Sequence, residues 1–525
     1  MTLGPHAFAD LLAEDFGTLP DLIRMHAARA PRHAAIRHDG HTLDYGELDA
    51  RIDRVAATLQ RDRLQPGDAI AICSANSSEY LQVFLGGLRA GVAVALLAPS
   101  TTAESLAAMV ADANARVVFL DEAAATTLAP VRAEIAAALV ALDGSDAGEP
   151  LSSWLAHAGA IPQPVTIEPE WPFNIIYSSG TTGTPKGIAQ PHAMRWSQVQ
   201  RGRSYGYGAN SVTLIATPLY SNTTLVAVFP ALAMGGTVVL MGKFDAAGFL
   251  ALAQQHRATH TMLVPVQYQR IMALADFDRY DLSSFRCKLC TSAPFAAKLK
   301  ADVLRRWPGG LIEFYGMTEG GGTAVLLAHE HPDKLQTVGC PAPGHDIRLI
   351  DDEGQEVPRG EIGEVVGHSR AMMTGYHGQP ARTAEAEWFD HTGKRFFRTG
   401  DVGRFDDDGF LVLLDRKKDM VISGGFNIYP SDLEAVIRQH ADVAEVAVVG
   451  VPSTRWGETP VAFVVAKSGV LLDALQLQRW ANARLGKMQR LAAVETINAL
   501  PRSPIGKVLK RELRDAYNAK SVGAC

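Results

Sequence analysis

The sequence has few of the features that mark secreted, membrane-spanning or nucleic-acid-binding proteins. Its net charge is −6 and it has no basic stripe with interleaved aromatic residues, so nucleic-acid binding is not expected. The first residues show no basic region followed by an apolar core, which argues against a secretory signal. The most apolar long stretch, residues 81–99, contains Arg89 and several glycines, and it predicts a buried helix followed by a strand rather than a membrane span. A cytoplasmic location is therefore expected, and the sequence does not indicate an oligomeric state.

Cysteine is also scarce, with five residues in 525. Cys287 and Cys290 are separated by two residues, a spacing that occurs in metal and redox sites. Structural metal sites usually need a second ligand pair, and no second cysteine pair stands at that spacing. We therefore expect Cys287 and Cys290 to be two thiols on one strand.

The chain is long enough for two or three hydrophobic cores, and its 47% hydrophobic and 20% charged residues are typical of a globular protein. Residues 40–130 alternate between helical and strand-like patterns, and residues 212–265 repeat the scheme. Such alternation predicts the α/β fold class, with two α/β subdomains built on parallel strands.

A change of character follows at about Thr337, where short strands with Gly-rich and Asp-rich turns predict a small β-barrel-like unit. A compact α+β pattern begins after residues 415–419, and Ser431 and Glu434 have the spacing of a capping box that opens a helix. We expect an N-terminal domain over residues 1–415 and a small C-terminal domain over residues 416–525.

The most informative segment is residues 177–187, a run of hydroxyls and glycines that contains Lys186 and follows an apolar strand. Glycines allow backbone N–H groups to approach an oxyanion closely, and the hydroxyls and the lysine add donors. The common P-loop does not fit, because Pro185 and Gly187 stand where that motif needs a glycine and a Ser or Thr. The segment predicts a polyphosphate site of another kind.

Seven further segments combine residue types that suit a nucleotide or its partners. An aromatic ring can flank a purine, a carboxylate can hold Mg²⁺ beside phosphates or accept ribose hydroxyls, and a lysine after a tight turn can neutralise a developing charge. The segments are residues 291–294 (TSAP), 314–320 (FYGMTEG), 398–401 (RTGD), 415–419 (DRKKD), 423–427 (SGGFN), 454–458 (TRWGE) and 501–507 (PRSPIGK).

In this order, the segments resemble the motifs of the adenylate-forming superfamily, which includes acyl- and aryl-CoA synthetases, peptide-synthetase adenylation domains and luciferases. The resemblance covers roughly residues 20–515, and the ordered set is far more specific than any one motif. It implies a large N-terminal domain and a mobile C-terminal domain that rotates about Lys418.

The resemblance implies ATP, Mg²⁺ and coenzyme A as ligands and gives roles to individual residues. Glu319 would bind Mg²⁺, and Lys507 would bridge the attacking carboxylate and the α-phosphate, with Lys186 as a further catalytic lysine. The implied nucleotide-binding residues are Ser178, Thr181, Thr182, Ser292, Ala293, Pro294, Tyr315, Thr318, Asp401 and Arg416. The implied CoA-binding residues are Gly424, Gly425 and Trp456, although a structural role for the tryptophan fits the sequence equally well.

The implied reaction has two steps. A carboxylate attacks the α-phosphate of ATP and expels pyrophosphate to give an acyl-adenylate, and after domain rotation the CoA thiol displaces AMP. The acid itself is less clearly indicated. Residues 218–224 (PLYSNTT) lack the aspartate with which peptide-synthetase domains usually hold an α-amino group, so an amino acid is disfavoured, and Ser221 stands where many CoA ligases have histidine.

The residues expected to line the acid pocket are Tyr220, Ser221, Asn222, Val266, Gly316, Met317 and Gly320. Glycines at 320–322 would leave room in that pocket, which favours an aryl or medium- to long-chain acid over acetate.

Three alternatives remain open at this point. The enzyme could form acyl-adenylates for another acceptor, such as a carrier protein, or it could be an oxygenase of the luciferase type. It could also be a non-enzymatic adenylate-binding regulator. Retention of Lys186, Glu319, Asp401 and Lys507 argues against the regulator, because a pure binder needs no catalytic lysine.

Overall fold

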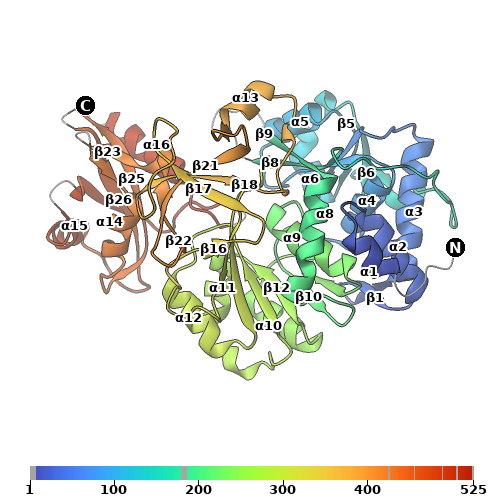
Figure 1. Cartoon of the computed structure of the whole chain (residues 1–525), viewed down its shortest axis with the longest axis horizontal. Helices are drawn as coiled ribbons and strands as arrows, with labels where there is room; N and C mark the ends of the chain where they lie inside the picture. Colours follow the sequence, from blue (N-terminus) through green and yellow to red (C-terminus); the bar gives the residue numbers. More distant parts are fainter. Residues whose placement is uncertain are drawn as a thin grey trace. The chain divides into compact units, whose positions relative to one another are not determined.

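The computed structural model describes residues 7–178, 186–423, 426–454, 456–486, 489–503 and 506–522. Contacts between residues divide the chain into two compact units, whose elements Figure 1 colours from blue at the N-terminus to red at the C-terminus. Unit 1 comprises residues 1–335, 341–346 and 367–397, and unit 2 comprises residues 336–340, 347–366 and 398–525. The functional division at residues 415 and 416 stays a prediction.

Two large sheets, both mainly parallel, organise unit 1. The first has the order β16 (Cys340–Pro341), β15 (Ala324–Leu327), β14 (Gly310–Tyr315), β13 (Cys287–Cys290), β12 (His260–Leu263), β10 (Val212–Ile215), β11 (Thr237–Leu240), β1 (Ala34–His38), β2 (His41–Asp44). The second has the order β19 (Gly375–Tyr376), β9 (Lys186–Pro191), β8 (Pro172–Ser178), β4 (Ala93–Leu96), β3 (Ala69–Cys73), β5 (Ala115–Leu120), β6 (Ala138–Ala141), β7 (Glu149–Pro150). The predicted α/β fold class is confirmed, and Cys287 and Cys290 are free, buried thiols of strand β13.

One hydrophobic core joins the two sheets of unit 1. It contains residues of both sheets, such as Ile70 and Val238, together with helix residues such as Phe84 and Phe229. Because both faces of the central strands are covered, β3 and β4 are apolar and buried at every position.

The helices of this unit are α1 (Ala7–Ala13), α2 (Leu19–Arg29), α3 (Tyr45–Arg61), α4 (Ser78–Arg89), α5 (Ala103–Asp112), α6 (Glu122–Leu128), α7 (Leu151–Trp154), α8 (His192–Gln200), α9 (Asn222–Ala233), α10 (Ala246–Gln255), α11 (Pro265–Met272), α12 (Ala297–Arg306) and α13 (Pro380–Glu385).

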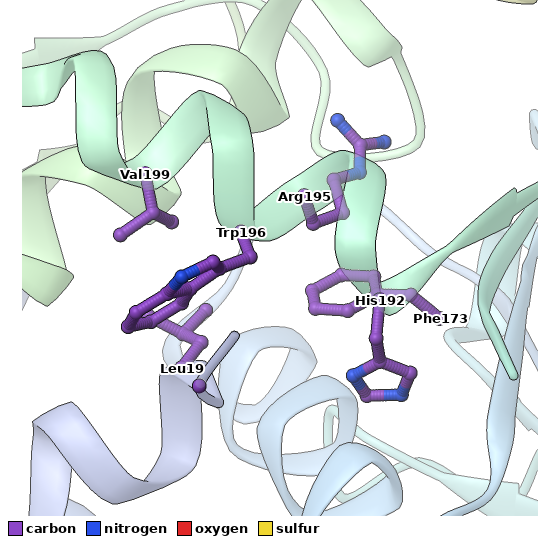
Figure 2. A pocket seen from close by; sticks show the side chains of 7 residues that line it. Leu19, Phe173, His192, Arg195, Trp196 and Val199 are labelled. Carbon is purple, nitrogen blue, oxygen red and sulfur yellow. The ribbon is translucent and has the colours of Figure 1, made fainter. Parts of the chain in front are cut away.

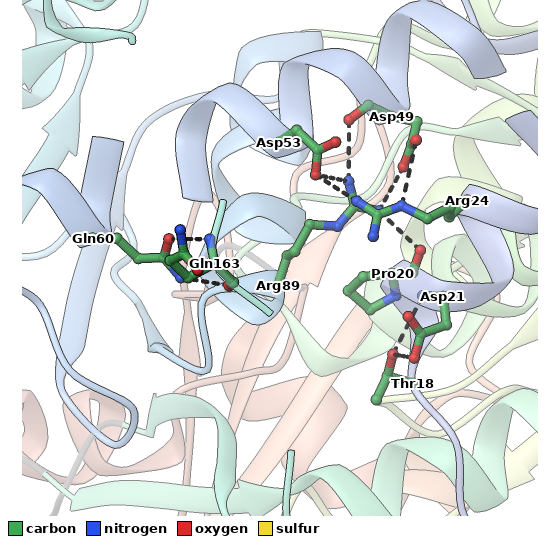
Figure 3. A network of polar contacts seen from close by, with 9 residues as sticks. All are labelled: Thr18, Pro20, Asp21, Arg24, Asp49, Asp53, Gln60, Arg89 and Gln163. Atoms are coloured by element: carbon green, nitrogen blue, oxygen red, sulfur yellow. Dashed lines mark hydrogen bonds and ion pairs between the residues drawn. The ribbon is translucent and has the colours of Figure 1, made fainter. Parts of the chain in front are cut away.

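An ion-pair network fastens the N-terminal helices to one another (Figure 3). The guanidinium of Arg89, at the end of α4, lies 2.6 Å from an Asp49 carboxylate oxygen and 2.9 Å from an Asp53 oxygen, both on α3. It also donates to the Pro20 carbonyl of α2 at 3.0 Å. The Arg89 side chain is only 7% exposed, whereas Arg24, which pairs with the same aspartates, is 46% exposed. Arg89 is therefore the central cation of this network.

Unit 2 combines a β-hairpin with a compact α+β fold. The hairpin of β21 (Arg395–Phe405) and β22 (Leu411–Arg416) belongs to a sheet with β17 (Asp346–Ile350), β18 (Gly363–His368) and β20 (Glu387–Phe389). Of this sheet, β20 and the end residues of β17, β18 and β21 are assigned to unit 1. The C-terminal sheet contains β24 (Phe426–Ile428), β23 (Val421–Ser423), β26 (Gly457–Ala466), β25 (Val443–Ser453) and β27 (Ala493–Thr496). The helices are α14 (Pro430–Ile437), α15 (Ala474–Asn482) and α16 (Lys510–Val522).

The capping box predicted for Ser431 and Glu434 is wrong. Helix α14 begins at Pro430, whose fixed φ and missing N–H suit the first helical position, and Tyr429 precedes it without a side-chain cap. The Ser431 N–H donates to an Asp415 carboxylate oxygen at 2.9 Å instead. Glu434 accepts the Val448 N–H at 2.9 Å, so both residues of the expected box have tertiary partners.

Across the described ranges, no helix is both long enough and apolar enough to span a membrane.

Candidate functional site

Lys186 and Glu319 are in direct contact in unit 1, although 133 positions separate them in the sequence. The Lys186 Nζ donates to Glu319 Oε1 at 3.1 Å, and the Tyr376 hydroxyl donates to the same oxygen at 2.9 Å. The ammonium also lies 4.0 Å from the centre of the Tyr376 ring. Burial and the nearby Glu319 carboxylate raise the pKa of Tyr376, so its hydroxyl stays a donor at neutral pH.

The Glu319 carboxylate is suitably arranged for Mg²⁺. Its side chain is 13% exposed, and Oε1 receives both hydrogen bonds, while Oε2 has no partner among the described residues. Mg²⁺ sites at nucleotides commonly use one or two carboxylates together with phosphate oxygens and water. Glu319 Oε2 therefore fits the role of a single protein ligand beside a polyphosphate.

Side-chain hydrogen bonds bring four predicted segments of unit 1 together. The Gln190 amide of strand β9 donates to the Thr318 carbonyl at 2.5 Å and to Asn222 Oδ1, at the start of α9, at 3.4 Å. The hydroxyls of Thr223 and Ser292 are also hydrogen-bonded. Ser292 has φ of 83°, a left-handed conformation that is uncommon for serine. The phosphate strand, the acid-pocket segment, the 291–294 segment and the 315–319 turn thus converge.

The other predicted residues of unit 1 lie in or next to these elements. Ser178 ends β8 and pairs in register with Lys186. Tyr315 is the buried last residue of β14, and Gly316 and Met317 follow it. Tyr220 is half-buried, Ser221 precedes α9, and Val266 is a half-buried residue of α11. Ala293 and Pro294 lie between β13 and α12. Thr181 and Thr182 lie outside the described residues.

The glycines at 320 and 321 have a packing role that the sequence analysis did not foresee. A Cβ on Gly320 would lie 2.0 Å from the Ala371 carbonyl oxygen, and a Cβ on Gly321 would lie 2.8 Å from the Gly367 carbonyl oxygen. Both residues also have positive φ. Because close backbone packing already requires these glycines, the expectation that they leave room for a large acid loses its basis.

In unit 2, Asp401 and Arg416, which are both predicted to hold the ribose, form an ion pair with each other. They stand opposite each other in the β21–β22 hairpin, and the Arg416 Nε lies 3.1 Å from Asp401 Oδ1. A hollow of about 390 Å³ lies beside them, lined by Thr399, Gly400, Arg416, Lys417 and Lys418. The hollow is open and rich in cations, as a site for a negatively charged ligand requires.

Lys507 interacts electrostatically with both Asp401 and Arg416. Burial, together with the nearby Arg416 and Lys418 cations, lowers the pKa of its ammonium to about 8. Asp401 and Asp419 oppose this lowering. Its backbone is held by Ser503, whose N–H donates to the Lys507 carbonyl at 2.8 Å. Lys507 is therefore a lysine whose charge changes close to physiological pH.

The predicted hinge and CoA residues are only partly described. Lys418 lies in the short 3₁₀ turn η4 (Lys417–Asp419) between β22 and β23. Trp456 is 40% exposed in the turn between β25 and β26. Gly424 and Gly425 lie outside the described residues, so the CoA-binding assignment stays a prediction.

Three residues that contact the site were missed by the sequence analysis. Tyr376 is 57 positions from Glu319 and belongs to no recognised motif. Gln190 and Arg195 follow the phosphate segment directly, and only the presence of polar residues in the apolar surroundings of β9 and α8 could have indicated them.

Arg195 borders a small cavity of about 10 Å³ with His192, Phe173 and Trp196 (Figure 2). That volume suffices for about one water molecule and not for a nucleotide.

Comparison with known proteins shows what the chain is similar to. The family model described as AMP-binding enzyme matches residues 23–377, and the model of the AMP-binding enzyme C-terminal domain matches residues 432–507. A feruloyl-CoA synthase from Amycolatopsis sp is 35% identical, with 94% of this chain and 97% of the relative covered.

Two further relatives are named for different acceptors. A fatty acid–[acyl-carrier-protein] ligase of Streptomyces coeruleorubidus is 32% identical over 95% of this chain and 96% of its own length. The solved structure of the amide bond synthetase McbA from Marinactinospora thermotolerans has a TM-score of 0.84 at 28% identity and covers 95% of this chain and 99% of its own. The relatives therefore agree on the family and differ in the group that receives the activated acid.

Proposed function

Since this chain belongs to the AMP-binding enzyme family, among its AMP-forming acid–thiol ligases, we propose that it joins an aryl or medium- to long-chain carboxylic acid to coenzyme A. The observation that carries the proposal is the contact between Lys186 and Glu319 Oε1, which leaves Glu319 Oε2 without a partner among the described residues. A lysine at the start of strand β9 and a carboxylate oxygen without a partner among the described residues suit the β- and γ-phosphates of ATP and their metal ion.

The first half-reaction forms the acyl-adenylate. The acid's carboxylate oxygen attacks the α-phosphorus of ATP, the bond to the β-phosphate breaks, and pyrophosphate leaves. Mg²⁺ bound through Glu319 would neutralise phosphate charge. Lys186 would steady the leaving pyrophosphate, Asp401 and Arg416 would hold the ribose, and the Lys507 ammonium would offset the charge that accumulates at the α-phosphate.

In the second half-reaction, the CoA thiol would lose its proton to solvent and its sulfur would attack the acyl carbon. The bond between that carbon and the phosphate oxygen breaks, and AMP leaves with both electrons. We propose that the segment after Arg416 turns about Lys418 between the two steps, and that Trp456 lies along the path of the pantetheine arm.

The acid is proposed from the relatives alone, because the glycine argument no longer supports it. The relative at 35% identity is named for an aryl acid, and another is named for fatty acids. Hydrophobic pockets discriminate weakly between acids that differ by one methylene, so a panel of acids is needed to identify the substrate.

Pyrophosphate release measured over fatty, benzoic and cinnamic acids, with and without CoA, tests the proposal. Acid-dependent pyrophosphate together with a CoA thioester supports it. Pyrophosphate without a thioester would favour another acceptor, and the absence of pyrophosphate with every acid would favour an adenylate-binding regulator.

The role of Lys507 is tested by separating the two half-reactions. Lys507→Ala should slow acyl-adenylate formation by at least about 100-fold, as loss of one transition-state donor does, and should spare thioester formation from a supplied adenylate. Lys520→Ala is a control, because Lys520 is 68% exposed and pairs with Glu495. Equal loss of both half-reactions would refute the assignment.

A further inference from the structure

Gln190 is a fully buried side chain of strand β9, four residues after Lys186, and it has four polar partners. Its Oε1 accepts hydrogen bonds from the Asn174 amide, at 2.9 Å, and from the Arg195 guanidinium. Its Nε2 donates to the Thr318 carbonyl at 2.5 Å and to Asn222 Oδ1 at 3.4 Å. Every hydrogen-bonding position of the amide in its plane is thus occupied.

The buried Arg195 fixes which way this amide points. Arg195 is 2% exposed and lies 5.8 Å from the ring centres of both Phe173 and Phe229, and Figure 2 shows it above Phe173. Its Nε and Nη2 each donate to Asn174 Oδ1 at 3.0 Å. No carboxylate pairs with it in the part of the chain that the structure describes, and burial lowers its pKa to about 9.

An arginine side chain can donate hydrogen bonds but cannot accept them. The amide atoms of Asn174 and Gln190 that face Arg195 must therefore be oxygens, and the Gln190 NH₂ group must point the other way. That direction leads to the Thr318 carbonyl. The orientation of Gln190 is a consequence of the buried cation rather than of local backbone preference.

Gln190 completes the support of the turn that carries Glu319. The Met317 carbonyl accepts the Gly320 N–H at 3.1 Å, and the Glu319 carbonyl accepts the Met373 N–H at 2.8 Å. The Thr318 carbonyl between them is held by Gln190, a side chain. Strand β9 therefore contacts this turn twice, through Lys186 at the Glu319 carboxylate and through Gln190 at the preceding carbonyl.

We infer that Gln190, oriented by Arg195, is a positioning residue that sets the direction of the Glu319 carboxylate toward the metal ion. The inference rests on the proposed function, because only an ATP-dependent activity gives Glu319 a metal to bind. Residues that orient a metal ligand without touching the metal typically change metal affinity or activity by about 10- to 100-fold when they are replaced.

Gln190→Glu separates this role from a purely structural one. The carboxylate stays ionised beside Arg195 and still accepts from Arg195 and Asn174, so the buried cation gains a counter-charge. It can no longer donate to the Thr318 carbonyl, and it places an acceptor oxygen against that carbonyl. The matched control is Gln198→Glu, because Gln198 Oε1 also accepts from Arg195, at 2.9 Å, from the next turn of α8.

Three measurements on the full-length chain decide the matter. For Gln190→Glu we expect an unchanged or higher Tm, a rise of about 10-fold or more in the Mg²⁺ concentration at half-maximal pyrophosphate release, and faster hydrogen exchange in the peptide that spans residues 315–323. For Gln198→Glu we expect wild-type values of all three. Wild-type Mg²⁺ dependence and wild-type exchange in folded Gln190→Glu would overturn the inference, as would equal effects of the two variants.

If Gln190→Glu does not fold, Gln190→Met replaces it. This variant removes the donor without adding a charge, and the same rise in the Mg²⁺ requirement is expected. If the wild type releases no pyrophosphate with any acid, the proposed function fails. Hydrogen exchange in residues 315–323 still tests the support of the turn in that case, and unchanged exchange would overturn it.

Discussion

The charge state of Lys507 gives the sharpest test of the unit 2 site, and Lys418→Met is the perturbation. Lys507 has a pKa of about 8, well below its ordinary value of 10.5. The lowering comes from burial first, then from the Arg416 cation, with a smaller contribution from Lys418. Asp401 and Asp419 act in the opposite direction.

The sign of the expected change follows from the charges. Only the ammonium form of Lys507 can offset the negative charge of the reaction, so acyl-adenylate formation should fall as pH rises through about 8. Removing the Lys418 cation makes that ammonium easier to form, and the pKa of Lys507 should rise. Because Lys418 is a minor cause, we expect a rise of less than about one pKa unit, so the rate at pH 9 should increase by less than about tenfold.

The assay is the acid-dependent exchange of pyrophosphate into ATP, measured from pH 6.5 to about pH 9.5. CoA is omitted, so that any effect of Lys418 on domain rotation does not enter the measured rate. Lys417→Met is the matched control. Lys417 lies in the same turn, pairs with Asp352 at 2.8 Å and Glu364 at 3.2 Å, and is not among the groups that shift the pKa of Lys507. The reasoning would be refuted if the exchange rate of Lys418→Met fell at the same pH as that of the wild type, or if Lys417→Met shifted this pH by as much as Lys418→Met.

Two further predictions concern stability. Arg89→Met should lower the free energy of unfolding in urea by about 3 kcal/mol, because two aspartates lose a buried partner. Arg24→Met should lower it by less than about 1 kcal/mol, because Arg24 is more exposed. Equal losses would contradict the expectation that the more buried arginine contributes more to stability. Gly320→Ala should lower Tm and activity, because its Cβ would collide with the Ala371 carbonyl. Gly344 has a similar positive φ, but a Cβ there would meet nothing within 4 Å. Gly344→Ala should therefore cost only the backbone strain of about 1 kcal/mol. Thermal unfolding of both alanine variants checks this, and an equal drop in Tm would show that φ alone matters.

The fold class could be predicted from the sequence because buried parallel strands leave a strong local signal. The apolar runs of residues 69–73 and 237–240 are strands, each followed by a helix. The start of α14 could not be predicted from the Ser431 spacing, because a tertiary acceptor, Asp415, takes the Ser431 N–H and Pro430 already opens the helix.

The site was foreseen only where a motif pointed to it. The motifs pointed to Lys186 and Glu319 but not to their direct contact. Tyr376 comes from a two-residue strand with no periodicity to detect. The role of Gln190 depends on a buried arginine that fixes its amide, which no local pattern reveals. Glycines 320 and 321 show the converse, since a sequence cannot tell whether a missing side chain makes room for a ligand or for another stretch of backbone.

The most direct test of the central claim is the product stoichiometry with the best acid of the panel, in the presence of ATP, Mg²⁺ and CoA. The account predicts that AMP, pyrophosphate and the acyl-CoA thioester form in equal amounts, and that none forms when the acid is omitted. Formation of ADP and phosphate, or of AMP and pyrophosphate without a thioester, would contradict it.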